Sequence, residues 1–116
     1  MRIDRVVGII NWEANMNVKQ VTMARVYALE GHDHLNLALN ILHDEEKITG
    51  VTVLRGIAGF GADRQVHTSS LLSLSLELPL ILEFYDEPEK VIKAINTLQT
   101  RLGLKHIISW DAQVHF

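Results

Sequence analysis

The sequence of 116 residues contains no cysteine. It therefore forms no disulfide, offers no thiolate nucleophile and builds no zinc–thiolate site, which excludes thiol redox and zinc-finger functions. The chain also lacks a strong excess of either charge, because it has 11 basic and 14 acidic residues. A net charge of -3 with scattered basic residues provides no field for a nucleic-acid backbone. We expect no nucleic-acid partner.

Long hydrophobic runs are missing as well. The apolar run over residues 6–10 is too short for a signal-peptide core, and no segment approaches the roughly 18 apolar residues of a membrane span. We therefore expect no membrane insertion and a cytoplasmic location. Hydrophobic residues still make up 47% of the chain, which argues against disorder, and the length suits one folded domain.

The first half of the chain predicts a strand, a helix and a second strand. β-Favouring residues dominate 19–29, which we interpret as the first core strand. Asp33 is a candidate N-cap and is followed by leucines at helical spacing, so we expect an amphipathic helix to about residue 47. A β-branched stretch over 50–58 predicts the second strand, which ends in a glycine-spaced turn over 59–61.

The second half predicts a strand, a helix and a last strand. Leucine and serine alternate over 69–78, which fits either an extended arm or the start of a short helix. The apolar stretch 80–85 predicts the third core strand. Asp86, with a proline and a glutamate just behind it, is a candidate N-cap for a helix that Gly103 closes. The stretch 106–110 predicts the fourth strand.

This order of elements predicts an α+β fold, the ferredoxin-like β-α-β-β-α-β split βαβ sandwich, with two helices on one face of an antiparallel sheet. We assign it to residues 18–116 and treat 1–17 as an N-terminal extension. The second face of the sheet would stay bare in a monomer, so the chain is expected to form an oligomer.

The segment 55–68 is the richest in chemistry. Its glycines at 56, 59 and 61 let the backbone take positive φ and let a ligand approach closely. Arg55 and Arg64 could pair with an anion, and Asp63 could hold a cation. Together these features suit a phosphate-bearing ligand. The alternative is purely structural: a bulge or close packing at Gly56, a simple turn, and a solvated Arg64.

Metal and catalytic functions have less support in the residues. The six histidines are scattered, and His32, His34 and Asp63 are the best donors for a divalent ion. No serine stands in a nucleophile-elbow context, and the acidic run 44–46 is typical of a solvated helix end. We expect the protein not to be an enzyme.

Residues 50–61, His67-Thr68 and the strand 80–85 carry a resemblance. In them the chain resembles the small bacterial PII-like proteins catalogued as a domain of unknown function. It is similar, more distantly, to the PII nitrogen-regulatory proteins, in which an Ile-Thr-Gly-x-Thr-Val strand start leads to Gly-Phe-Gly and then His-Thr. These motifs stand here at 48–53, 59–61 and 67–68.

The resemblance implies a homotrimeric signalling protein that binds an adenine nucleotide between subunits. It also implies contact with a target protein, such as a transporter or channel, through the loop that follows Gly-Phe-Gly, here 62–78. Thr52, Gly59 and Gly61 match positions that face the nucleotide in PII proteins. The candidate ligand-binding residues are therefore Thr52, Arg55, Gly59, Phe60, Gly61, Asp63, Arg64, His67 and Thr68.

The chain also departs from the PII pattern. Asp63 stands where PII carries a glutamine, and the loop 62–78 has no tyrosine for uridylylation. The second, glycine-rich phosphate loop is missing, and Arg101 and Lys105 could replace it or simply interact with the helix dipole. Two alternatives therefore stay open: a structural adaptor without a ligand, and a divalent-metal tolerance protein.

Overall fold

The computed structural model describes residues 17–29, 34–60, 66–68 and 79–116. The described helices are α1 (His34–Asn40), its π-helical continuation η2 (Ile41–Glu45) and α2 (Pro88–Leu102). The described strands are β1 (Val18–Leu29), β2 (Gly50–Arg55), β3 (Ala58–Gly59), β4 (His67–Thr68), β5 (Pro79–Asp86) and β6 (Ile107–His115). The predicted extension 1–17 lies outside this part of the chain except for Asn17, so the predicted domain division stays a prediction.

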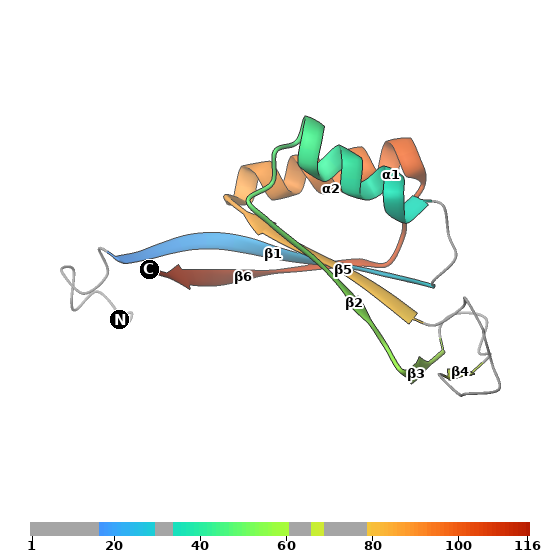
Figure 1. Cartoon of the computed structure of the whole chain (residues 1–116). Coiled ribbons are helices and arrows are strands. Elements are labelled where there is room, and N and C mark those ends of the chain that lie inside the picture. The colour runs from blue at the N-terminus through green and yellow to red at the C-terminus, as the bar shows by residue number, and fades with distance from the viewer. Residues whose placement is uncertain (1–16, 30–33, 61–65, 69–78) are drawn as a thin grey trace.

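The four long strands form one antiparallel sheet in the order β2-β5-β1-β6. Both helices lie on the same side of it (Figure 1). This is the predicted α+β, ferredoxin-like arrangement. The small β3–β4 pair, a two-stranded sheet of its own beyond the end of β2, is an addition to that plan.

The core lies between the helices and the sheet. Side chains of β5 alternate between buried and half-buried, because successive residues of a strand point to opposite faces. Phe84, at its centre, is fully buried, and the residues packed around it include Ala24, Ala38, Leu42, Val91, Ala94 and Leu98. The face of the sheet that carries Phe84 is called the helix face below, and the other is called the open face.

The first predicted helix is shorter than expected. α1 ends at Asn40 and continues as the π-helical turn η2, in which the amide of Glu46 donates to the carbonyl of Ile41 at 2.9 Å. The wider turn accommodates two adjacent buried side chains, Ile41 and Leu42. The predicted continuous helix to about residue 47 was therefore wrong in its last turn.

Two other predicted boundaries were wrong. The second strand ends at Arg55 rather than at residue 58. The amide of Gly56 still donates to the carbonyl of Pro79, the next residue in the register with β5, at 2.7 Å, but Pro79 has no N–H with which to return the bond. The last strand runs to His115 rather than to residue 110, because β1 starts at Val18 and pairs with β6 along its whole first part.

Helix α2 begins one residue later than predicted. Glu87 is the N-cap, whereas Asp86 is the last residue of β5. The predicted end is confirmed: Gly103 takes the left-handed conformation, with φ 66°, and its amide donates to the carbonyls of Gln99 and Leu98.

Gly103→Ala is expected to destabilise the fold by about 1 kcal/mol, because a side chain disfavours positive φ. A Cβ at this position would meet no atom within 4 Å, so the loss comes from backbone conformation alone. Urea denaturation should order the variants Gly, then Asn, then Ala, since asparagine tolerates this conformation. Equal stability of all three would contradict the assignment.

Candidate functional site

The glycine segment after β2 is shaped by close packing. A Cβ on Gly56 would lie 3.2 Å from Cβ of Pro79, and one on Gly59 would lie 2.9 Å from Cγ of Pro79. Neither glycine has a positive φ. The positive φ that glycine permits is therefore not used at either position, and at Gly56 the structural alternative, close packing, is what is observed. What these positions require is the space that a missing side chain leaves for Pro79.

The β3–β4 pair brings two of the predicted motifs together. Gly59 pairs with His67, and Ala58 pairs with Thr68. The predicted site residues Gly59, Phe60, His67 and Thr68 therefore lie at one place in the fold. Gly61, Asp63 and Arg64 lie outside the described residues, as do most of the loop 62–78 and all of 69–78.

Thr52 and Arg55 do not share a face of the sheet. Val51 packs into the core, so it and Arg55, an even number of residues away, belong to the helix face. Thr52 belongs to the open face and pairs with Glu83. One ligand lying on a single face of β2 would not contact both side chains.

The open face carries a charged pair among aromatic side chains. Nε of Arg25 donates to Oε1 of Glu83 at 2.5 Å, and the guanidinium lies 5.6 Å from the centroid of the Trp110 ring. The hydrogen bonds to Glu83 and then to Tyr27 raise the pKa of Arg25 above its usual value. Arg25 therefore stays charged and fixed by its neighbours.

Large apolar side chains surround this pair. Tyr27 is 43% exposed, Trp110 40% and Ile108 53%. A bare face was predicted from the sequence, but these residues were not predicted to lie on it. Their alternation along β1 and β6 was the available signal, although the pairing of Arg25 with Glu83 depends on the register between β1 and β5.

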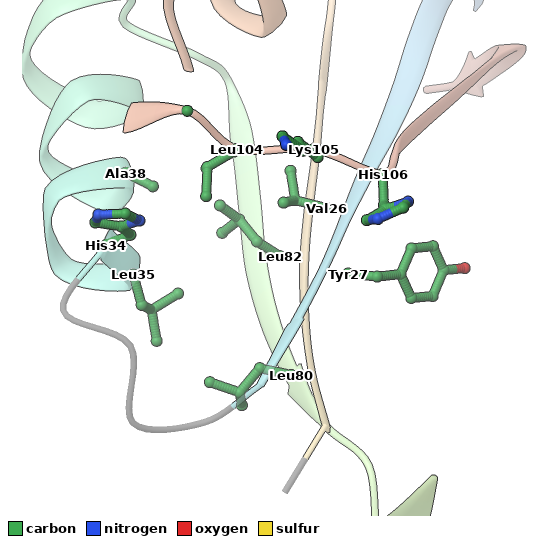
Figure 2. A pocket seen from close by; sticks show the side chains of 11 residues that line it. Val26, Tyr27, His34, Leu35, Ala38, Leu80, Leu82, Leu104, Lys105 and His106 are labelled. Atoms are coloured by element: carbon green, nitrogen blue, oxygen red, sulfur yellow. The ribbon is translucent and has the colours of Figure 1, made fainter. Parts of the chain in front are cut away.

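A cavity of about 280 Å³ lies on the helix face, between α1, the ends of β1 and β5, and the connection from α2 to β6. Figure 2 shows apolar side chains along it and the side chains of His34, Lys105 and His106 around it. Of the two cations expected near the missing phosphate loop, Arg101 is bound to Glu45, which raises its pKa. Lys105 makes no hydrogen bond or ion pair with the described residues.

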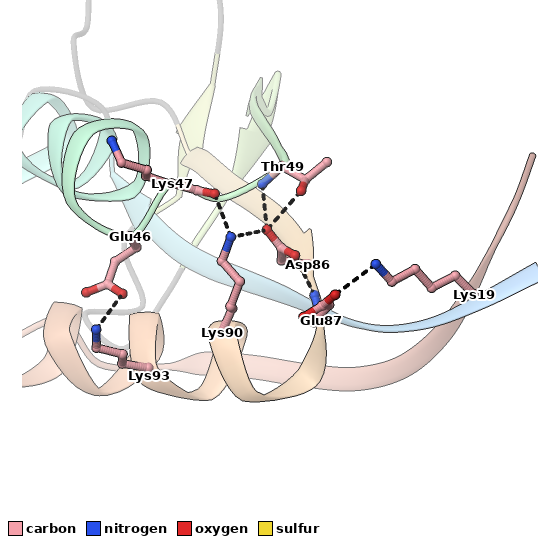
Figure 3. Close-up of polar contacts among 8 residues, drawn as sticks. All are labelled: Lys19, Glu46, Lys47, Thr49, Asp86, Glu87, Lys90 and Lys93. Carbon is pink, nitrogen blue, oxygen red and sulfur yellow. Dashed lines mark hydrogen bonds and ion pairs between the residues drawn. The ribbon is translucent and has the colours of Figure 1, made fainter.

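A third polar group, at the opposite end of the helices, is structural. Oδ2 of Asp86 accepts from the amide and the hydroxyl of Thr49 at 2.8 and 2.9 Å, and its Oδ1 accepts from the amide of Glu87 at 2.7 Å (Figure 3). Lys90 lies 3.2 Å away. Burial opposes ionisation of Asp86, but these donors outweigh it, and the pKa lies below its usual 3.8. The carboxylate joins β5 to the start of β2 and of α2.

No metal centre can be assembled from the part of the chain described. Within it, no three or more histidine, aspartate or glutamate side chains gather. Of the three donors considered from the sequence, His34 is described and lines the cavity, whereas His32 and Asp63 lie outside the described residues. In the described chain, no helix is both long and apolar enough to span a membrane.

The family model described as Uncharacterized ACR, COG1993 (DUF190) matches residues 21–114. The chain belongs to this family. A protein of similar sequence is the UPF0166 protein of Aquifex aeolicus. It is 39% identical over 79 residues, which cover 68% of this chain and 79% of that protein. The resemblance to the PII-like proteins of unknown function is thereby confirmed.

Two solved structures are similar to this DUF190 chain in fold. CPII of Thiomonas intermedia, a nitrogen regulatory PII-like protein bound to ADP, AMP and bicarbonate, has a TM-score of 0.66 and 18% identity, covering 85% of this chain and 92% of its own. The divalent ion tolerance protein CutA1 of Ehrlichia chaffeensis has a TM-score of 0.55 and 15% identity, covering 79% of this chain and 80% of its own. At these identities the likeness shows a shared PII-like fold.

Proposed function

We propose that this chain forms a PII-like homotrimer that binds a small anionic ligand, with an adenine nucleotide as the leading candidate, in a cleft between subunits. In this proposal it is a cytoplasmic regulatory protein rather than an enzyme, and its loop 62–78 contacts a target such as a transporter or channel. The observation that carries the proposal is the open face, which lacks a cover in the described chain and bears the aromatic cluster around Arg25.

The chemistry of the open face supports burial against other copies. An unpaired charge would oppose burial, but Arg25 already has its counter-ion in Glu83 and an aromatic ring beside it. Tyr27 and Trp110 offer large apolar areas of the kind that interfaces use. Three copies with this face turned inward would cover it.

The end of β2 supports anion binding. Arg55 ends this strand, and the close-packed Gly56 and Gly59 lead from it to the β3–β4 pair. A guanidinium recognises phosphate and carboxylate groups through paired donors. The similar fold of CPII has been solved with ADP, AMP and bicarbonate, all of which are anions.

Exposed apolar residues at the base of the loop 62–78 support contact with a target protein. Ile57 is 80% exposed, Phe60 56% and Val66 63%, around the small β3–β4 pair. Exposed apolar groups that lie near one another are typical of protein interaction sites. A ligand would act as a regulator if it bound more tightly to one state of this loop than to another.

Calorimetry with ATP, ADP, AMP and bicarbonate tests the ligand. At least one nucleotide is expected to bind, and Arg55→Ala is expected to weaken it roughly tenfold or more, the loss typical of one charge-assisted contact. Lys93→Ala removes the same charge from an exposed position on α2 and serves as the control. If no anion binds, the ligand-binding half of the proposal fails and the adaptor alternative remains.

A further inference from the structure

The cavity beside α1 combines two properties that the proposed function does not use. Most of its lining is apolar, with Leu35, Ala38, Leu80, Leu82 and Leu104 among the residues that form it. Three basic side chains also line it, those of His34, Lys105 and His106. His34, on α1, and His106, beside Tyr27, lie on opposite sides of it (Figure 2), so Lys105 is the cationic side chain of the lining. An apolar space with one ammonium beside it is complementary to a molecule with an apolar body and one negative charge.

The basic residues are not engaged elsewhere in the described structure. His34, Lys105 and His106 make no hydrogen bond or ion pair with a described residue, in contrast to Arg101, which is bound to Glu45. His106 has a φ of 59°, a conformation that costs a non-glycine residue energy. That conformation lies in the connection that places Lys105 and His106 at the cavity.

The cavity is large enough for a small organic molecule. Its volume of about 280 Å³ is many times the roughly 10–15 Å³ that one water molecule needs.

We propose that this cavity binds a small amphipathic carboxylate, with the carboxylate at Lys105 and an unbranched or cyclic apolar body against the leucines. The site lies between α1, the ends of β1 and β5, and the connection from α2 to β6. With this cavity the protein would bind a second class of ligand, in addition to the proposed nucleotide.

Titration calorimetry with butanoate, hexanoate, octanoate and decanoate tests this inference. Affinity is expected to rise up to about fourfold with each methylene added, the factor that corresponds to burying one such group, and to stop rising once the cavity is full. Octanol, which lacks the charge, is expected to bind at least tenfold more weakly than octanoate. Equal affinity for octanol and octanoate, or no dependence on chain length, would overturn the inference.

Two variants locate the site. Lys105→Gln is expected to weaken octanoate about tenfold, whereas Lys93→Gln, the same change on the outer side of α2, should leave the affinity within twofold. Ala38→Leu should fill the cavity and abolish binding. If Ala38→Leu fails to fold, Lys105→Gln decides alone, because Lys105 is exposed. An unchanged affinity in Lys105→Gln would refute the assignment, whatever the outcome of the nucleotide titrations.

Discussion

Ile108→Lys is expected to dissociate the proposed trimer into folded monomers at about 10 µM protein. Ile108 lies on the open face opposite Arg25, so the new ammonium would sit beside an existing positive charge. Burying a charge without a counter-ion costs several kcal/mol, and a trimer would contain three such sites. Size-exclusion chromatography with light scattering, together with native mass spectrometry, measures the change.

Ile92→Lys is the matched control for this prediction. Ile92 is 63% exposed on α2, and Ile108 is 53% exposed on the sheet, so the two variants make the same substitution at similarly exposed positions. The control should remain trimeric with an unchanged circular dichroism spectrum. A trimeric Ile108→Lys, or a monomeric wild-type protein, would show that the open face is not the interface.

The same variant separates the two ligand proposals. A nucleotide bound between subunits needs the trimer, so its affinity should be lost in the Ile108→Lys monomer. The residues that carry the octanoate proposal, Lys105 and the leucines, belong to one chain, so the affinity for octanoate should persist there. Loss of both ligands together would count against a site contained within one subunit.

The parts of the fold that depend on short-range pattern could be predicted from the sequence. The alternation along β5 and the spacing along α2 depend on which residues are apolar, and Gly103 ends the helix because its own conformation allows it. The π-helical turn at Ile41–Glu45 could not be predicted in this way. In it each N–H donates to the carbonyl five residues earlier instead of four, and the spacing of the apolar residues does not reveal that change.

The candidate site was predicted as a set of residues close together in the sequence, without regard to which face of the sheet each one occupies. Thr52 and Arg55 are three residues apart on one strand, and that odd spacing alone places them on opposite faces. The sequence therefore held the signal, but the prediction treated them as one site. The pair Arg25–Glu83 could not be found so easily, because its partners are 58 residues apart and meet only through the register of β1 and β5.

Asp86→Asn is expected to destabilise the protein by about 2 kcal/mol at pH 7, measured by urea denaturation. Asp86 is 6% exposed, and its carboxylate accepts hydrogen bonds from the backbone amides of Thr49 and Glu87. The amide group of asparagine has one acceptor oxygen in place of two, so one of these part-buried N–H groups loses its partner. Asp111→Asn, an exposed position on β6, is the control and should change stability by less than about 0.5 kcal/mol.

The pH dependence of this difference tests the cause. Folding lowers the pKa of Asp86 below 3.8, so the folded state favours the ionised carboxylate. The stabilisation from ionised Asp86 is therefore fully present above the unfolded pKa and is lost as the pH falls through the lower, folded pKa. The gap between wild type and Asp86→Asn should hold from pH 7 to about pH 5 and narrow below about pH 4. A gap that stays constant down to pH 2.5 would mean that asparagine fails there for steric reasons, and that the ionised carboxylate does not join β2 to β5.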